Sequence, residues 1–141
     1  MAGYLGFDSI AYNTYDAGQI YTSENAADAA AVTNNIALHI GSFIEEIMQQ
    51  YAQPRPWIIL REGGGNTYVS SAMPQKRNPG ILNNARRDAS MLLGDGTTVL
   101  FRAHNIPAGM PDGRTGAETL LKDAAKLVRD FDHILQALVI D

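Results

Sequence analysis

Residues 36–51 read IALHIGSFIEEIMQQY, and this stretch decides the fold. Its large apolar side chains recur three or four positions apart, the spacing of one face of an α-helix: Ile36, Ile40, Phe43, Ile44, Ile47, Met48 and Tyr51. No proline occurs between Asn13 and Tyr51, and Asn13 is suited to cap a helix N-terminus. We therefore predict a first long helix over about residues 14–51.

A second apolar stripe follows the dipeptide Asn78-Pro79. Asparagine is favourable at a helix N-cap and proline at the first helical position, so the spacing predicts a helix over about residues 78–102. Gly94 and Gly96 lie inside it, and each costs on the order of 1 kcal/mol relative to alanine. We expect close packing of a neighbouring helix to compensate for both glycines.

A third stripe begins at Thr115 and Glu118, which form a capping-box pattern. Leucines and alanines continue it at helical spacing as far as Leu138, which predicts a helix over about residues 115–139. No strand-like alternation of any length is present. The fold class that we predict is therefore all-α, a bundle of three main long helices.

The length of the first helix bears on assembly. A helix of about 38 residues spans roughly 57 Å, whereas a compact chain of this size has a radius of gyration near ~14 Å. We expect lateral association into a larger helical bundle. Alternatively, the first helix could break at Asn34 and Asn35, because asparagine is a poor former of helix interiors.

Composition narrows the classes of function. The chain has 141 residues, enough for one domain, and its net charge of −4 disfavours nucleic-acid binding. It contains no cysteine, which excludes disulfides and thiolate metal sites. No apolar run is long enough to cross a bilayer, and the first residues do not resemble a signal peptide. We expect a soluble, cytoplasmic protein without a membrane partner.

The segment from residue 52 to residue 77 contains prolines and three consecutive glycines, so we predict a long mobile loop there. Its last part, residues 69–79, reads VSSAMPQKRNP and runs directly into the second helix. Two hydroxyls and two cations thus precede a helix N-terminus, a place that binds anions. These residues indicate an anion site with a potential base, although a polar loop that only caps the helix would have the same composition.

This run resembles the signature loop of the fumarase/aspartase superfamily, Gly-Ser-Ser-x-Met-Pro-x-Lys-x-Asn-Pro, and departs from it at Val69, where glycine is usual. Three other segments are similar to argininosuccinate lyases: LGFD at residues 5–8, NTYDA at residues 13–17, and the dipeptide Ile106-Pro107. The resemblance implies the partial central helical domain of such an enzyme, from which the upstream substrate-binding segments are missing.

The resemblance also implies a reaction. These enzymes eliminate an amine or a hydroxyl group from a succinyl-type substrate and release fumarate, without a metal or an organic cofactor. Ser70 matches the general base, and Lys76 and Asn78 match the ligands of the substrate carboxylate. Closure of the glycine-rich loop would bring the base to the substrate. Further residues are implied to line the site: Ser71, Met73 and Gln75.

Two departures concern the amine half of the substrate. Residues 18–22 replace an Asp-Arg-Asp run of argininosuccinate lyases, and Met110-Pro111 replaces a Tyr-Asn pair. The resemblance therefore implies another N-substituted aspartate as substrate, in a homotetramer whose active sites draw on three subunits. We expect the isolated chain to be inactive. The alternative is a non-catalytic helical assembly module that retains a vestigial loop.

A few other residues have simpler interpretations. His39, His104 and His133 lack metal-ligand spacing, and His39 and His133 are interpreted as ordinary helix residues. Arg86 and Arg87 are expected to form ion pairs on the surface or between subunits. Trp57 is expected to anchor the loop to the bundle. The three glycines are not followed by the Gly-Lys-Ser/Thr of a phosphate-binding loop.

Overall fold

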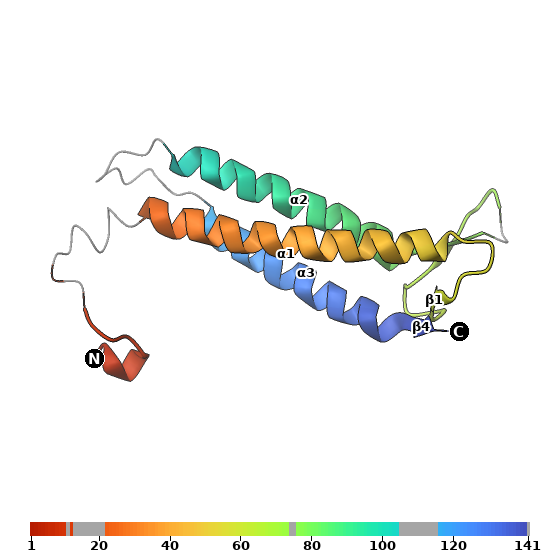
Figure 1. The fold of residues 1–141 in the computed structure, drawn as a ribbon, viewed down its shortest axis with the longest axis horizontal. Helices are drawn as coiled ribbons and strands as arrows, with labels where there is room; N and C mark the ends of the chain where they lie inside the picture. The colour runs from red at the N-terminus through yellow and green to blue at the C-terminus, as the bar shows by residue number, and fades with distance from the viewer. Residues whose placement is uncertain (11, 13–21, 74–75, 105–115, 141) are drawn as a thin grey trace.

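Three long helices lie side by side and form an elongated bundle (Figure 1). The structure is a computed structural model that describes residues 1–10, 12, 22–73, 76–104 and 116–140. The helices are α1 (Thr22–Tyr51), α2 (Gly80–Ala103) and α3 (Ala117–Ala137). The expected all-α class with three main helices is confirmed.

Short elements gather mainly at one end of the bundle. Strand β1 (Ile58–Leu60) pairs antiparallel with β4 (Leu138–Ile140), and β2 (Tyr68–Val69) pairs antiparallel with β3 (Arg77–Asn78). A single 3-10 turn, η1 (Gly3–Leu5), lies near the N-terminus. The segment expected as one long loop therefore contains two strands and leads into a third.

Helix α1 runs unbroken through Asn34 and Asn35, so the alternative of a break at these residues is wrong. Its 30 residues span about 45 Å at 1.5 Å per residue. The first part of the predicted helix, residues 14–21, and its expected cap Asn13 lie outside the described residues. Burial of the α1 stripe against both other helices outweighs the low helix propensity of the two asparagines.

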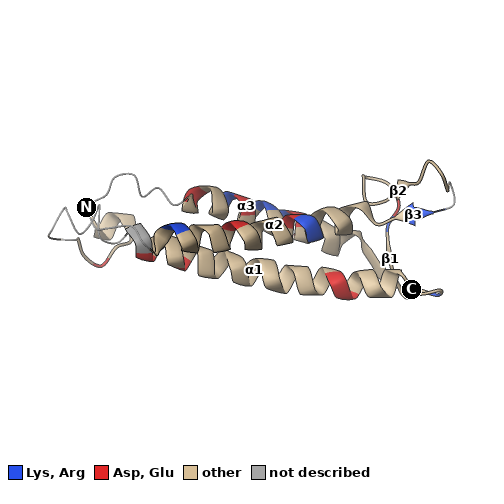
Figure 2. Cartoon of the chain, turned by 90° about the horizontal axis from the view of Figure 1, so that it is seen from above, with Lys and Arg blue, Asp and Glu red and all other residues tan. Residues whose placement is uncertain are grey.

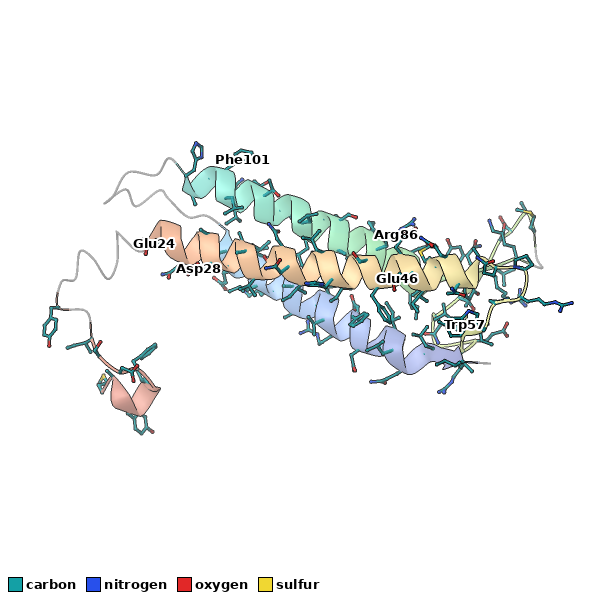
Figure 3. The ribbon with its side chains drawn as sticks, in the orientation of Figure 1. Glu24, Asp28, Glu46, Trp57, Arg86 and Phe101 are labelled. Carbon is teal, nitrogen blue, oxygen red and sulfur yellow. The ribbon has the colours of Figure 1, made fainter. Side chains whose placement is uncertain are left out.

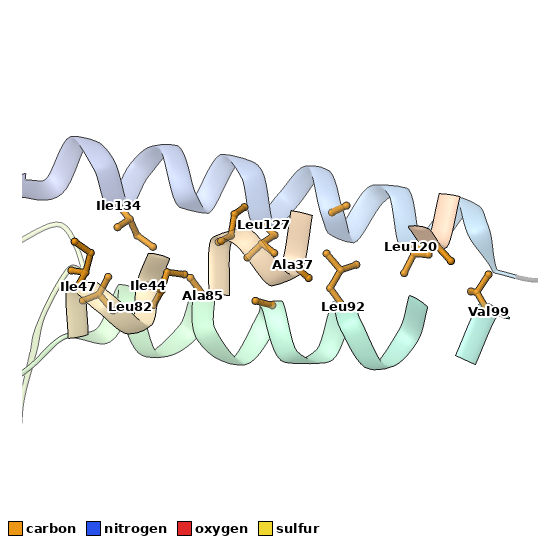
Figure 4. Packing of buried hydrophobic residues seen from close by; sticks show 14 of the residues in the cluster. Ala37, Ile44, Ile47, Leu82, Ala85, Leu92, Val99, Leu120, Leu127 and Ile134 are labelled. Carbon is orange, nitrogen blue, oxygen red and sulfur yellow. The ribbon is translucent and has the colours of Figure 1, made fainter. Parts of the chain in front are cut away.

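The core follows the apolar stripes of the three helices. Leu127 and Ile134 of α3 point toward Leu82 and Leu92 of α2 (Figure 4), and each of these four side chains is at most 2% exposed. Ile44 of α1 is fully buried in the same cluster. Continuous burial of this kind is the main source of helix stability in proteins, because isolated helices are marginal in water.

The two glycines of α2 differ. Gly96 is buried, and a Cβ atom added to it would overlap the side chain of Asn34 on α1. Close packing was expected at this position and is confirmed. At Gly94 an added Cβ atom would meet nothing within 4 Å, so the same expectation is wrong there. Gly94 lies on the exposed side of α2, where no neighbouring helix approaches.

Helix α3 ends at Ala137, close to the predicted end, and the chain then changes to an extended strand. Leu138 has φ −68° and ψ 139°, and its strand pairs with β1. The backbone N–H of Arg61 also donates to the carbonyl of Ala137, over 2.8 Å between nitrogen and oxygen. Leu138, which the periodicity assigned to the helix, therefore belongs to β4 because a partner strand is available there.

Charges of both signs alternate along α2 and α3, and positive charge lies at β3 (Figure 2). Of the helices in the described part of the chain, none combines the length and the apolarity that crossing a bilayer requires.

Candidate active site

The predicted catalytic residues lie around the tip of the hairpin formed by β2 and β3. The register pairs Tyr68 with Asn78 and Val69 with Arg77. Ser70 directly follows β2 and Lys76 directly precedes β3, so the register, extended by one residue, sets them opposite each other. Facing residues of an antiparallel pair project from the same side of the sheet. The two residues to which the resemblance assigns the base and the carboxylate ligand therefore flank the tip of the hairpin.

Two hydrogen bonds shape the hairpin tip around Met73. The backbone N–H of Met73 donates to Ser70 Oγ over 3.4 Å, and the backbone N–H of Lys76 donates to the Met73 carbonyl over 2.9 Å. Ser70 is partly buried, whereas Ser71, Met73 and Lys76 are exposed. An amide aimed at the serine oxygen is the kind of donor that stabilises negative charge on it. Gln75 lies outside the described residues.

Asn78 does not cap α2 as its position suggested. Its backbone is part of β3, and its side-chain Nδ2 donates to the Tyr68 carbonyl over 3.5 Å. Pro79 is the N-cap residue and makes no side-chain cap hydrogen bond, and Gly80 is the first helical residue. The prediction of an Asn78 cap with Pro79 in the first helical position is therefore wrong by one residue, because pairing with β2 holds Asn78 in an extended conformation.

A backbone amide at the N-terminus of α2 is already hydrogen-bonded to another part of the chain. The backbone N–H of Ile81, in the first turn, donates to the Asn66 carbonyl over 3.2 Å. Gly80 is buried under the Tyr68 ring, and a Cβ atom added to it would lie 3.0 Å from Tyr68 Cδ1. The expectation that this helix end presents free amides to an anion is corrected for Ile81, whose amide already has an acceptor.

The segment that leads into the hairpin turns through three glycines in the left-handed region. Gly63, Gly64 and Gly65 have φ values of 92°, 60° and 81°. Residues with side chains rarely adopt this region, so the backbone conformation alone accounts for the three consecutive glycines, without a role in phosphate binding. The turn closes with the N–H of Asn66, which donates to the Gly63 carbonyl over 3.0 Å.

Sequence reasoning missed Asn66 and its partner His133. Asn66 is only 6% exposed, and His133 Nε2 lies 3.1 Å from Asn66 Oδ1. His133, interpreted as an ordinary helix residue, thus ties α3 to the base of the hairpin. The two residues are 67 positions apart, so no local spacing could have connected them. The one available signal was an asparagine directly after a glycine run.

A groove of about 550 Å³ lies beside the hairpin, between its base and the end of α1. Arg77 and Glu62 line it and form an ion pair, with 3.3 Å between Nε and Oε1. Burial raises the pKa of the Tyr51 phenol in the same groove, Glu62 adds to this rise, and Arg77 opposes it. Because Arg77 alternates with Asn78 along β3, these two side chains project from opposite faces of the hairpin.

The remaining candidates have roles in packing and ion pairing. Arg86 pairs with Glu45 of α1 over 3.2 Å, and Arg87 pairs with Asp88 over 3.1 Å. Trp57 lies beside the ends of α1 and α3 (Figure 3). Its side chain is 52% exposed, so the end of the bundle encloses it only in part. Within the described ranges no cluster of three or more His, Cys, Asp or Glu residues is arranged to hold a metal ion.

Comparisons with known proteins show that this chain is similar to argininosuccinate lyases. Argininosuccinate lyase of Acidothermus cellulolyticus is 32% identical over 107 residues, which are 76% of this chain and 21% of that protein. The same enzyme of Corynebacterium efficiens is 34% identical over 95 residues, 67% of this chain and 19% of that protein. That of Pelotomaculum thermopropionicum is 28% identical over 129 residues, 92% of this chain and 27% of that protein.

The chain thus spans between 19% and 27% of the length of these curated relatives. No protein-family model matches it. The similarity extends over most of the chain. The chain therefore belongs to the fumarase/aspartase superfamily, and the relatives that it resembles there are argininosuccinate lyases.

Proposed function

We propose that this chain supplies the proton-abstracting loop of a carbon–nitrogen lyase, which eliminates an amine from an N-substituted aspartate and releases fumarate. One observation carries the proposal: Ser70 directly follows β2 and Lys76 directly precedes β3, so the β2–β3 register, extended by one residue, would set them opposite each other at the hairpin tip. The names of the relatives support a lyase. The relatives are much longer than this chain, so the proposal concerns the part of the reaction that these residues perform.

In this proposal Ser70 is the general base. Its alkoxide removes a proton from the carbon next to a substrate carboxylate, and the electron pair of that C–H bond forms an enediolate. The enediolate then collapses to the carbon–carbon double bond of fumarate, while the C–N bond breaks and the amine leaves with its electron pair and gains a proton. A serine alkoxide requires strong stabilisation. The Met73 amide, which already donates to Ser70 Oγ, is suited to provide part of it.

Lys76 and Asn78 are assigned to the carboxylate that becomes the enediolate. The Lys76 side chain is exposed at the hairpin tip, where its ammonium group can reach a bound anion. Asn78 Nδ2 makes only a long 3.5 Å bond to the Tyr68 carbonyl, which it can exchange for a bond to a carboxylate. Because the Ile81 amide is occupied, these side chains and the loop amides carry more of the stabilisation than the helix end does. Ser71, Met73 and Gln75 are proposed to line the site.

We also propose a homo-oligomer as the working form, a tetramer as the family resemblance implies. Large apolar side chains are at least 45% exposed along the three helices: Val32, Leu38, Met91, Phe101, Leu121, Val128 and Leu135. Covering them in a larger bundle would remove this apolar surface from water. Light scattering of the purified chain tests this part, and a stable folded monomer would contradict it.

A chimera tests the reaction. Residues of this chain replace the segment that they match in the Acidothermus cellulolyticus argininosuccinate lyase, and fumarate is followed by its ultraviolet absorbance. The substrates are argininosuccinate and a panel of N-substituted aspartates. We expect turnover of at least one member of the panel. Ser70→Ala should lower the rate by about 100- to 10,000-fold, the usual contribution of a general base.

Ser90→Ala is the matched control, because Ser90 is an exposed serine on α2 whose hydroxyl donates only to the Arg86 carbonyl. It should leave the rate unchanged. Circular dichroism establishes that each variant is folded. A folded chimera that releases no fumarate from any substrate would contradict the proposal and favour the non-catalytic assembly module, as would full activity of the Ser70→Ala variant.

A further inference from the structure

Asn66 is a fully hydrogen-bonded polar residue at the hairpin end. Its N–H donates to the Gly63 carbonyl over 3.0 Å, and its carbonyl accepts from the Ile81 N–H over 3.2 Å. Its side-chain Nδ2 donates to the Arg61 carbonyl over 2.8 Å, and Oδ1 lies 3.1 Å from His133 Nε2. All four polar groups of a residue that is 6% exposed therefore have partners. Loss of any one partner would leave a buried polar group unsatisfied.

These contacts fix the direction of the bond to His133. The carbonyl of Arg61 can only accept a hydrogen bond, so the amide nitrogen of Asn66 must face it. The side-chain oxygen of Asn66 then faces His133, and His133 Nε2 must carry the hydrogen that it donates. The network thus specifies a single tautomer of His133 whenever the imidazole is neutral.

Asn66 lies where the chain enters the hairpin, so its hydrogen bonds bear on the position of the hairpin. Asn66 lies two residues before β2 and four residues before Ser70. Its carbonyl is bonded to the first turn of α2, and its side chain is bonded to α3. Asn66, from which the chain enters the hairpin, is thus hydrogen-bonded to both α2 and α3. On the other side the hairpin leads through Pro79 into the same end of α2.

We infer that Asn66 and His133 are positioning residues, which hold the β2–β3 hairpin so that Ser70 lies where the substrate proton can be removed. The effect on catalysis rests on the proposed function. That Asn66 and His133 hold the hairpin can be tested without turnover. Small displacements of a catalytic group lower rates strongly, so a hairpin on a looser base would slow proton abstraction.

The first test uses the 141-residue chain and amide hydrogen exchange. His133→Phe removes the donor, and we expect exchange at the Asn66 and Lys76 amides to accelerate by roughly 2- to 10-fold, the effect of one lost hydrogen bond on local opening. Exchange at Leu92, in the core of α2, should not change. His133→Gln, which retains a donor, should restore slow exchange. His39→Phe is the matched control, since His39 is exposed on α1.

Nitrogen-15 NMR of the imidazole ring is an independent readout. We expect the neutral His133 side chain to be protonated at Nε2, whereas His39 should show no tautomer imposed by Asn66. Protonation at Nδ1 of neutral His133 would overturn the inference, because Asn66 Oδ1 would then face a ring nitrogen without a hydrogen. Unchanged exchange at Asn66 and Lys76 in His133→Phe would overturn it as well, as would an acceleration that extends equally to Leu92.

The kinetic test uses the active chimera. His133→Phe should lower kcat by about 10- to 100-fold, because a less firmly held hairpin misplaces the base, and KM should rise as well, because Lys76 lies on the same hairpin. His133→Gln should recover most of the lost rate. An unchanged kcat, or a loss that His133→Gln does not rescue, would overturn the positioning role. If the unsubstituted chimera releases no fumarate, the proposed function fails, and the exchange and NMR results still decide whether the pair holds the hairpin.

Discussion

The helical bundle and its hairpin end are stabilised in different ways. In the bundle, large apolar side chains such as Ile44, Leu82 and Leu127 are almost completely buried. At the hairpin, Tyr68 and Val69 are 55% and 51% exposed, and the segment is held by short strands and by the polar contacts of Asn66. The difference teaches that the helical bundle supplies stability, while the proposed reactive groups lie on a small hairpin whose position depends on a few hydrogen bonds.

The largest effect should come from the bundle. Leu127→Ala removes a side chain that is 1% exposed, and we expect it to lower the free energy of unfolding by about 2–5 kcal/mol. Leu121→Ala, six residues earlier on α3, removes one that is 51% exposed and should cost less than about 0.5 kcal/mol. Chemical denaturation followed by circular dichroism measures both. Equal losses would show that burial does not distinguish the two faces of α3.

The hairpin should respond in the opposite manner, through activity and not through stability. Lys76→Met in the chimera should lower kcat/KM by roughly 10- to 150-fold, the value of one hydrogen bond to a charged group. The free energy of unfolding should not change, because Lys76 is exposed. Arg87→Met is the control, an exposed cation paired with Asp88 away from the hairpin. A loss of stability without a loss of activity would contradict the separation of the two regions.

Two glycines of α2 sharpen the comparison within the bundle. Gly96→Ala should destabilise the chain by about 1–3 kcal/mol, because the added methyl group overlaps Asn34 in a packed interface. Gly94→Ala should instead stabilise it by about 0.5–1 kcal/mol, since it restores helix propensity in open space. Thermal unfolding of both variants checks the signs. Stabilisation by Gly96→Ala would mean that the Asn34 side chain turns away from the added methyl group at little cost.

The smallest effect concerns an ion cluster on the bundle surface. Lys126 donates to Asp88 over 2.8 Å and to Asp130 over 2.6 Å. Burial works to raise the pKa of Asp88, but hydrogen bonds from Lys126 and Arg87 outweigh it and lower that pKa below its usual value. The Asp88 contribution to stability is therefore present above the ordinary aspartate pKa and is lost as the pH falls through the lowered one.

Lys126→Met should accordingly flatten the loss of stability as the pH falls below the ordinary aspartate pKa, by less than about 1 kcal/mol because Lys126 is exposed and Asp88 is only partly buried. Lys122→Met provides the control, as Lys122 pairs only with the exposed Glu118. Thermal unfolding as a function of pH measures both. The idea fails if the two variants show the same dependence on pH as the unsubstituted chain.

The sequence allowed the bundle to be predicted far better than the hairpin end. The stripe that contains Ile40, Ile44 and Ile47 repeats at helical spacing, and all three residues are buried. Helical periodicity is a local pattern, so it can be recognised in the sequence without knowing which helix packs against it. Strands β1 and β4 were missed because three-residue strands are too short to show alternation, and because their pairing joins residues about eighty positions apart.

At the candidate site, the motif predicted candidate residues but not how they are held. Ser70 and Lys76 could be named from the loop pattern, whereas the hairpin whose two strands they adjoin became evident only in the structure. The error at Asn78 has the same origin, since local propensity favoured a cap and pairing with β2 overrode it. Asn66 and His133 had no local signal that linked them, because their contact depends on the packing of α3.

A double-mutant cycle on kcat/KM in the chimera is the most direct test of the central claim that Ser70 and Lys76 act at one site. If both serve the same proton transfer, the Ser70→Ala, Lys76→Met double variant should be about as slow as Ser70→Ala alone, because residues that act as a unit are strongly non-additive. If the two losses instead multiply, the residues act independently, and the account of the hairpin as a single catalytic device is contradicted.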